Sequence, residues 1–144
     1  MTTDIDYAQL VAAIGDAVIV SDTQGAITLW NAAAERMFGF TQAEALGQSL
    51  DLIIPERQRQ RHWDGYDKTM RTGLTRYGND VLRVPALHKD GHALSIAFTV
   101  ALLRKPDGSV DTIVAVVRDE TARFAEDRKL RRRLADLEAL KANA

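Results

Sequence analysis

Histidine has the widest chemical range of the side chains in this sequence, and it occurs at three positions, His62, His88 and His92. A neutral imidazole can bind a metal ion, and it is also a common axial ligand of a haem iron. His88 and His92 flank the segment Lys89-Asp90-Gly91, which is typical of a hairpin turn, so we expect both side chains to be solvated. His62 is therefore the histidine that the sequence favours as a cofactor ligand.

Nothing in the sequence indicates a catalytic group. Cysteine is absent, which excludes disulfides, thiolate metal ligands, a cysteine nucleophile and flavin photochemistry through a cysteinyl bond. The serine-hydrolase elbow, the phosphate-binding glycine loop and the His-Glu-x-x-His zinc motif are also missing. We therefore expect a protein that is not an enzyme, with no catalytic residue and no dedicated metal site.

The composition indicates one ordinary domain. The chain has 144 residues, of which 46% are hydrophobic, enough for a single core. Lys and Arg number 19 against 20 Asp and Glu, so the formal net charge of -1 gives no basic field for nucleic acid or an anionic membrane. The N-terminal residues lack the basic region of a signal peptide, and no apolar run approaches the roughly 18 residues of a membrane span. We expect a cytoplasmic protein.

A helix predicted over residues 55–72 must position His62. Pro55 fits its first turn, and Gly73 is suited to end it. Successive helical residues are about 100° apart, so His62 stands beside the apolar face and can turn inward or stay at its rim. The side chains of that face are Trp63, Tyr66 and Met70.

The segment before this helix predicts two further helices and a hairpin. Residues 17–21 and 26–30 are apolar runs that form a β-hairpin with Gly25 in its turn, and two short helices follow with Asn31 and Thr41 as N-caps. Residues 4–14 predict an amphipathic helix that begins with a capping box formed by Thr3 and Asp6. Its apolar positions are Tyr7, Leu10, Val11 and Ile14.

The later segments predict an antiparallel meander. Residues 81–88, 92–103 and 110–118 alternate with a period of two and are separated by turns that contain glycine. Pro85 cannot donate to a strand ladder, so its strand is expected at a sheet edge. The middle strand carries large apolar side chains on one face and small ones on the other, so a helix or ligand can approach that second face closely.

A final helix is predicted from residue 120 to 141, with Asp119 as its cap. Leu130, Leu134 and Leu137 have the 4,3 spacing of a short coiled-coil seam. The basic run at residues 128–133 is interpreted as a solvated flank of this seam, with Asp127 one turn before Arg131.

Several local patterns resemble the PAS family of sensor domains. The predicted order is strand, strand, three helices and three strands, between an amphipathic helix and a coiled-coil helix, and the resemblance covers roughly residues 13–121. The segments that carry it are residues 16–25, 27–40, 44–48, 52–57, 89–91 and 117–121. The resemblance implies an α+β PAS fold, with a five-stranded antiparallel sheet and helices on one face. It divides the chain into a cap helix (1–15), a PAS domain (16–119) and a signalling helix (120–144).

The region from Pro55 to Gly91 resembles the haem-binding PAS domains of oxygen-sensing bacterial kinases and phosphodiesterases. In an alignment without gaps, His62 falls on the haem-ligating histidine of that group. Two positions depart from the pattern, because the aromatic residue of the next turn is one position late at Tyr66, and Leu82 replaces an arginine that contacts oxygen in the rhizobial sensors. The resemblance implies a pocket lined by Trp63, Tyr66, Met70 and Leu82, with His62 as the axial ligand.

Other occupants of this pocket stay open. Arg61-His62, Gly65 and Thr72-Gly73 also resemble PAS domains without a known cofactor, in which His62 would be a polar or half-buried helix residue. A non-covalent FAD, an apolar organic molecule such as a fatty acid, and no ligand at all are the alternatives to haem. If haem binds, Leu82 gives an apolar distal side that suits carbon monoxide or nitric oxide at least as well as oxygen.

The resemblance implies a sensory, signal-transducing module that passes a conformational change to the last helix, and a ligand-free dimerisation module is the alternative. In the family, the pair Asp119 and Thr121 couples the sheet to that helix. No kinase, cyclase or phosphodiesterase region fits into residues 122–144, so the effector is expected on a partner protein or after this segment. We expect a homodimer formed by the terminal helices through Leu10, Val11, Ile14, Leu130, Leu134 and Leu137.

Overall fold

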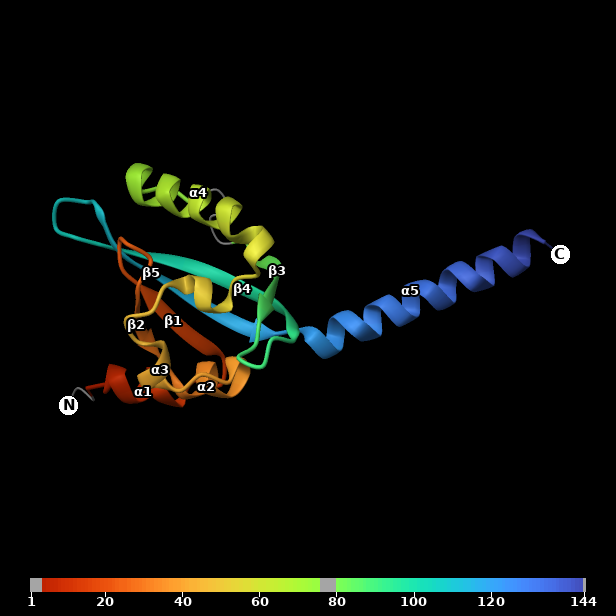
Figure 1. Cartoon of the computed structure of the whole chain (residues 1–144), viewed down its shortest axis with the longest axis horizontal. Coiled ribbons are helices and arrows are strands. Elements are labelled where there is room, and N and C mark those ends of the chain that lie inside the picture. The colour runs from red at the N-terminus through yellow and green to blue at the C-terminus, as the bar shows by residue number, and fades with distance from the viewer. Residues whose placement is uncertain (1–3, 76–79, 144) are drawn as a thin grey trace.

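The computed structural model describes residues 4–75 and 80–143 of the chain. Its centre is a five-stranded antiparallel sheet in the order β2-β1-β5-β4-β3. The helices α1 to α4 pack around the sheet, whereas α5 leaves it (Figure 1). The strands are β1 (Ala17–Ser21), β2 (Ile27–Trp30), β3 (Leu82–Leu87), β4 (Ala93–Arg104) and β5 (Val110–Asp119). This is the α+β architecture that the sequence predicts.

The sheet joins the two ends of the domain because β1 pairs with β5 in its centre. Val18 is opposite Val116 and Val20 is opposite Val114 in this pairing. The hairpin of β1 and β2 turns through Gly25, which has a positive φ of 80° that residues with a Cβ rarely adopt. The predicted hairpin is confirmed.

Two capped helices, α2 (Ala32–Phe38) and α3 (Gln42–Ala45), follow the hairpin. The Asn31 carboxamide is buried and accepts hydrogen bonds from the N–H groups of Ala34, 3.0 Å, and Val18, 2.9 Å, so it joins the helix start to β1. Thr41 forms the predicted capping box with Glu44. A 3-10 helix, η1 (Leu50–Ile53), comes next, and the sequence analysis did not predict it.

The long helix α4 (Glu56–Thr72) packs beside the sheet (Figure 1) and contributes Tyr66 to the core. Pro55 is its N-cap, one position before the first turn, and Gly73 ends it with a φ of 69°. The core beneath α4 joins side chains of the helices and the sheet, including Trp30, Phe38, Tyr66, Ile96 and Val117. The long helix therefore contributes to the same core as the hairpin.

The outer strands follow the predicted pattern. Pro85 is in β3, which is an edge strand as expected for a residue without an N–H group. In β4, Leu94 and Ile96 are buried, whereas Ala93, Thr99 and Ala101 on the opposite face are exposed. Large side chains of β4 thus complete the core.

The first helix, α1 (Tyr7–Ala13), is shorter than predicted. Asp6 is its N-cap and accepts a hydrogen bond from the Gln9 N–H group, so the helix does not begin at residue 4. Thr3, the other half of the expected capping box, lies outside the described residues. The Asn31 carboxamide donates to the Val11 carbonyl at 2.9 Å, which ties the end of α1 to the start of α2.

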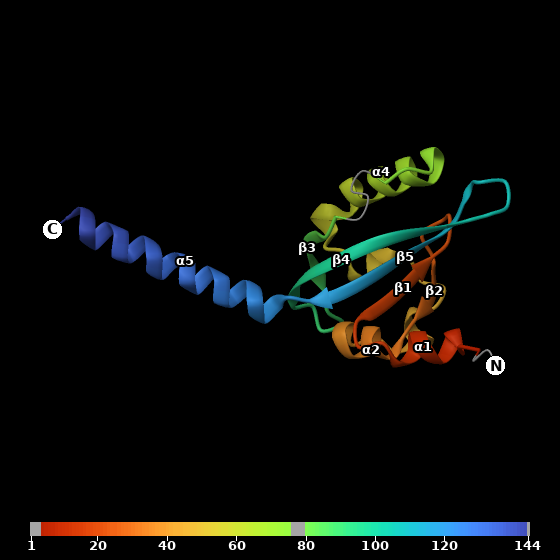
Figure 2. The ribbon, with the colours of Figure 1, turned by 180° about the vertical axis from the view of Figure 1, so that it is seen from behind.

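The last helix, α5 (Thr121–Ala142), extends away from the domain in both views (Figures 1 and 2). None of its residues is buried. Glu120 and not Asp119 holds the N-cap position, and it makes no capping hydrogen bond through its side chain. Within residues 4–75 and 80–143, no helix is both long and apolar enough to cross a membrane.

Candidate functional site

The apolar face of α4 forms an aromatic cluster above the sheet. The ring centroids of His62 and Trp63 are 4.7 Å apart, those of Trp63 and Tyr66 5.1 Å, and those of His62 and Tyr66 5.7 Å. Met70 continues this face one turn later and packs against the core. The structure therefore brings together four of the five residues predicted around the pocket.

Tyr66 is the deepest member of the cluster, with 7% of its surface exposed. Its hydroxyl donates to the Asp22 carbonyl and lies 2.9 Å from the Ser21 hydroxyl, at the end of β1. Burial raises the pKa of the Tyr66 hydroxyl, and the hydrogen bond to Ser21 partly offsets this effect. The hydroxyl thus remains protonated and fixes α4 to the hairpin.

Trp63 closes the cluster on the side of the β1–β2 turn. Its indole N–H donates to Asp51 Oδ1 at 2.7 Å, which joins α4 to η1. Its ring lies against Gly25, where a Cβ atom would stand 2.1 Å from the ring. The glycine therefore serves both the turn and the close approach of the indole, which explains why no larger residue fits there.

His62 is half-buried, and its Nδ1 atom is buried without a hydrogen-bond partner among residues 4–75 and 80–143. Burial lowers the pKa of His62, and the nearby Asp51 carboxylate opposes this shift. The imidazole is consequently neutral near pH 7, and it keeps a nitrogen that no group in the described part of the chain satisfies. Such a nitrogen is the feature of this face that could bind a ligand.

Leu82 is farther along the sheet, on edge strand β3, where it pairs with Phe98 of β4 and is half-buried. A surface hollow of about 620 Å³ lies near the other end of β3, and it is lined by Pro55, Glu56, Arg57, Pro85, Leu87 and Ala93. This set contains none of the residues predicted to line the pocket. The His62 ring lies against those of Trp63 and Tyr66, which belong to or pack against the core.

A second cluster forms the root of α5. The Asp119 carboxylate accepts from the Thr121 N–H group at 2.8 Å and from the Thr121 hydroxyl at 2.5 Å. The same hydroxyl accepts from the Ser95 N–H group at 3.0 Å, and the Ser95 carbonyl accepts from the Glu120 N–H group at 2.8 Å. The two predicted coupling residues therefore meet, and they connect α5 to the first residues of β4.

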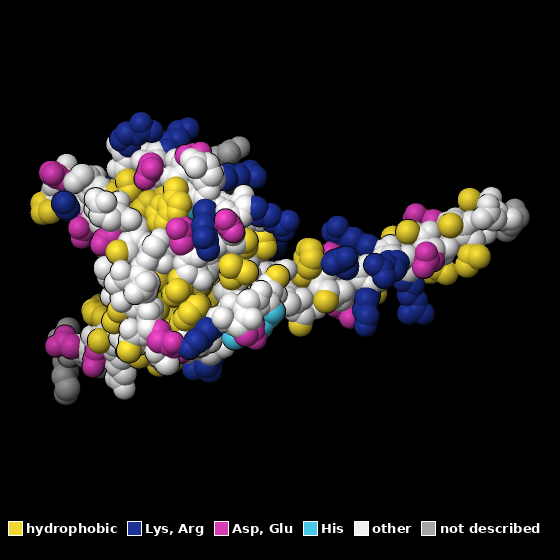
Figure 3. All heavy atoms as spheres, viewed as in Figure 1, with side chains coloured by type: hydrophobic (Ala, Val, Ile, Leu, Met, Phe, Trp, Pro, Cys, Tyr) yellow, Lys and Arg dark blue, Asp and Glu magenta, His cyan; other side chains and the backbone are white. Residues whose placement is uncertain are grey.

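The residues predicted to form a dimer differ in exposure. Leu130, Leu134 and Leu137 are each 57% exposed, and Leu140 is 68% exposed. In α1, Leu10 is 46% exposed, but Val11 and Ile14 are half-buried in their own domain. The expected ion pair of Asp127 and Arg131 forms at 3.1 Å on α5, among the basic side chains that Figure 3 shows along this helix. The leucines of α5 therefore expose more apolar side-chain surface than the predicted contact residues at the N-terminus.

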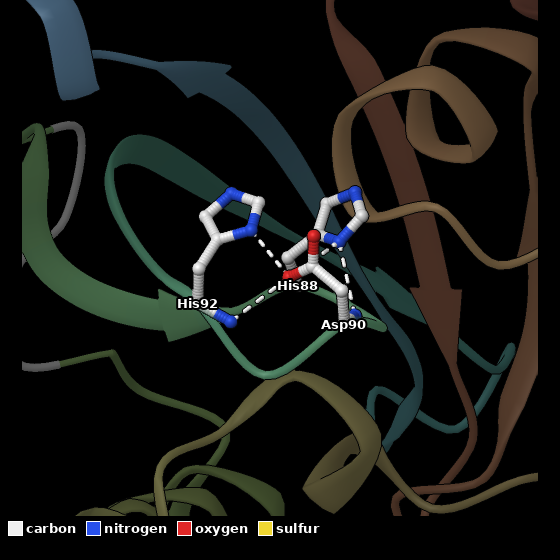
Figure 4. Close-up of side chains that lie close together, drawn as sticks. All are labelled: His88, Asp90 and His92. Atoms are coloured by element: carbon white, nitrogen blue, oxygen red, sulfur yellow. Dashed lines mark hydrogen bonds and ion pairs between the residues drawn. The ribbon is translucent and has the colours of Figure 1, made fainter.

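A third cluster was not predicted from the sequence. His88, Asp90 and His92 turn toward one another across the β3–β4 turn (Figure 4). The expectation that both histidines are solvated is wrong for His88, which keeps only 23% of its side-chain surface exposed. Its ring packs against Gly39, where a Cβ atom would stand 2.6 Å from the ring. The alternation His-x-Asp-x-His around a tight turn is the sequence signal that could have indicated this cluster.

The fold combines a five-stranded sheet covered by helices with one helix that leaves the domain. The PAS fold family matches residues 5–119, which is most of the chain, so the chain belongs to the PAS family. The family assignment from the sequence is confirmed. PAS domains are sensory domains that occur in signalling proteins.

Among curated proteins, the chain is similar to Sensor protein FixL of Bradyrhizobium diazoefficiens, with 41% identity over 71 residues, 49% of this chain and 14% of that protein. It is also 36% identical over 118 residues to an uncharacterized protein of Azorhizobium caulinodans, covering 81% of this chain and 16% of that one. The chain therefore spans about a sixth or less of the length of these relatives.

Known structures share the fold at low sequence identity. A PAS domain from Colwellia psychrerythraea matches with a TM-score of 0.71 and 22% identity, over 81% of this chain and 95% of that one. A sensory box histidine kinase/response regulator from Burkholderia thailandensis matches with a TM-score of 0.66 and 15% identity, over 94% and 99% of the two chains. These likenesses support the fold.

Proposed function

We propose that this PAS domain is a signal-transducing module whose output is the angle and pairing of α5. The observation that supports this function is the hydrogen-bonded root of α5, where Thr121 and Glu120 bind both backbone groups of Ser95. The start of the helix is thereby attached to β4, a strand two places away from β1 across the sheet. A displacement of β4 relative to β5 must break these bonds or move α5.

The input side of this module is the aromatic face of α4. Tyr66 connects α4 to the end of β1, and β1 pairs with β5 over the whole length of β1. Because β5 continues directly into the root of α5, a shift of α4 reaches the helix through strands that are hydrogen-bonded to one another. No further helix or strand is then needed to connect α4, the input side, with α5, the output.

The output side requires a second chain. Four leucines of α5 are each more than half exposed, and beyond its root the helix is kept regular by the helix propensity of its residues. Two α5 helices can bury Leu130, Leu134 and Leu137 against each other, with the charged side chains on the outside. We therefore propose a homodimer through α5, with Leu10 of α1 as an additional apolar contact.

Spin labels can test the coupling, because the chain has no cysteine of its own. Labels on Thr99→Cys in β4 and Ala135→Cys in α5, in chains diluted with unlabelled protein, report how firmly the helix is held. We expect a narrow distance distribution that broadens in Thr121→Val, which removes the hydroxyl that Ser95 and Asp119 bind. Equal widths in both proteins would refute the coupling.

The matched control for this experiment is Thr23→Val, which makes the same change in the exposed β1–β2 turn. Its distance distribution should be that of the unmodified domain. A broadening of equal size in both variants would show that the distribution reports general loosening and not the root of α5, and this result would also contradict the proposal.

A second candidate function is haem-based gas sensing through His62. The observation that favours it is the neutral imidazole with a buried, unpartnered Nδ1 atom, on the helix where a haem ligand is expected from the sequence. His62 would supply the iron ligand, and the haem would supply an iron that binds a diatomic gas. The hollow near the end of β3 is not lined by His62, so the signalling module without haem is the first proposal and haem sensing the second.

Absorption spectra separate the two candidates. The protein is purified from haem-supplemented cells and measured in the oxidised and reduced states beside His62→Ala. A Soret band that disappears in His62→Ala would establish haem sensing. A flat visible spectrum in both proteins would exclude it, and mass spectrometry of an organic extract would then identify any colourless ligand.

A further inference from the structure

The β3–β4 turn brings three ligand-type side chains into one cluster. His88 and His92 stand on either side of Asp90, with their rings stacked at a centroid distance of 4.5 Å. His88 Nδ1 is 3.2 Å from Asp90 Oδ1, and His92 Nδ1 contacts the same oxygen (Figure 4). One ligand atom from each residue can be chosen so that all three lie within 4.8 Å of one another.

The backbone fixes this arrangement. The His88 N–H group donates to the His92 carbonyl at 3.0 Å, and the Gly91 N–H group donates to the His88 carbonyl at 2.9 Å. Gly91 has a φ of 93°, which closes the turn in a conformation that favours glycine. The side chains at the first, third and fifth positions of the turn are therefore held on one side of it.

Contacts with α2 and α3 restrict the cluster further. The His88 ring lies against Gly39 at the end of α2, and the Lys89 N–H group donates to the Phe38 carbonyl at 2.9 Å. Lys89 also pairs with Glu44 of α3 at 2.5 Å, so its positive charge is engaged by another carboxylate. His88 is consequently oriented before any ligand binds, whereas Asp90 and His92 remain accessible from solvent.

The distances within the cluster are in the range of metal ligands. His88 Nδ1 lies 3.2 Å from Asp90 Oδ1, and it also accepts from the Asp90 N–H group at 3.1 Å, a bond that a metal ion at Nδ1 would replace. Ligands of a tetrahedral zinc ion are about 3.3 Å apart, given metal–ligand bonds of about 2.0–2.1 Å.

We infer that His88, Asp90 and His92 form a binding site for a divalent transition metal ion such as Zn²⁺. Two imidazoles and one carboxylate suit Zn²⁺, Ni²⁺ or Cu²⁺, whereas Mg²⁺ and Ca²⁺ prefer oxygen ligands alone. The three side chains supply three ligands, and water or a group from another molecule completes the coordination. The bound ion would join the ends of β3 and β4 to each other.

Calorimetric titration of the tag-free protein with zinc chloride tests this site. We expect one ion to bind per chain, with an affinity at least about tenfold lower in His92→Gln and in Asp90→Asn. The matched control is His62→Gln, which removes the one histidine outside the cluster and should leave the affinity unchanged. Absence of saturable binding, or equal affinities in all four proteins, would overturn the inference.

A measurement on the unmodified protein excludes loss of folding as the cause. Amide chemical shifts are recorded by NMR with and without one equivalent of zinc chloride. The inference predicts changes confined to the β3–β4 turn and to its neighbours Phe38 and Gly39. Changes centred on α4 or α5 would show that the ion binds elsewhere, and they would refute the site.

Discussion

The helices α4 and α5 have similar apolar spacing in the sequence, but they differ in where the apolar side chains go. On α4, Tyr66 keeps 7% of its surface exposed and forms hydrogen bonds with the hairpin. On α5, Leu134 keeps 57% exposed and contacts no part of the sheet-centred core. The same pattern therefore leads to intramolecular packing in one helix and to an unoccupied surface in the other.

The difference follows from the connections of the two helices. The segment before α4 returns the chain to the sheet through η1, whose Asp51 binds Trp63, so α4 has to lie against the core. In contrast, α5 continues in the direction of β5 away from the domain (Figure 2). A periodic apolar pattern thus predicts that a helix has a partner, but it does not say whether that partner belongs to the same chain.

The largest expected effect is on α4. Tyr66→Ala should lower the free energy of unfolding by about 3–5 kcal/mol, because a large buried ring is lost together with its hydrogen bonds. Tyr66→Phe should lower it by about 1–2 kcal/mol, since only the hydroxyl is removed. Urea denaturation followed by tryptophan fluorescence measures both. A change below 1 kcal/mol in Tyr66→Ala would show that α4 is not part of the core.

The corresponding change on α5 should affect association and leave the fold intact. Leu134→Arg places a charge in the proposed seam, so we expect the dissociation constant of the dimer to rise at least about tenfold, or 1.4 kcal/mol. The near-ultraviolet circular dichroism of the domain should not change. The control Ala135→Arg adds the same charge one residue later, about 100° around the helix and outside the seam. Unfolding in Leu134→Arg would mean that Leu134 belongs to the core.

A smaller effect concerns the pH dependence that His62 gives to α4. Burial lowers the pKa of His62 in the folded protein below that in the unfolded chain, so the unfolded chain binds the proton more readily. The resulting stabilisation is present above about pH 6.5 and decreases as the pH falls below that value toward the folded-state pKa. Stability between about pH 7 and pH 5 should fall less steeply in His62→Gln, as urea denaturation at each pH would show. Identical slopes would contradict the buried neutral imidazole.

The smallest effect is expected for the ion pair on α5. Asp127 and Arg131 are exposed and one turn apart, so their interaction is worth about 0.3–0.5 kcal/mol at most. Arg131→Gln should therefore reduce the helical circular dichroism of the chain only slightly and should not alter dimerisation. A dimer that dissociates in this variant would place the basic face of α5, and not its leucines, at the interface.

Much of the fold could be predicted because its signals are local. Four residues occupy the positions that their backbone chemistry favours, namely Asn31, Thr41, Gly25 and Pro85. The hydrogen bonds between Asp119 and Thr121 also join near neighbours in the sequence. The order of helices and strands could be predicted from these signals together with the period-two pattern of side chains in the strands.

The remainder depends on contacts between distant segments. The packing of His88 on Gly39 joins residues that are far apart in the sequence, so the turn histidines could not be distinguished from solvated ones. The burial of the His62 Nδ1 atom and the packing of the aromatic cluster on α4 also depend on contacts in three dimensions. The N-cap of α5 is one residue later than predicted, because Asp119 is the last residue of β5.

Sedimentation equilibrium of the unmodified chain tests the central claim, that α5 is an output helix that requires a second chain. At roughly tens of micromolar, a range in which a seam of this kind should be populated, the account predicts a mass of twice 15.9 kDa. A monomer over this whole range would contradict it, because the leucines of α5 would then have no partner copy and the proposed output would be lost.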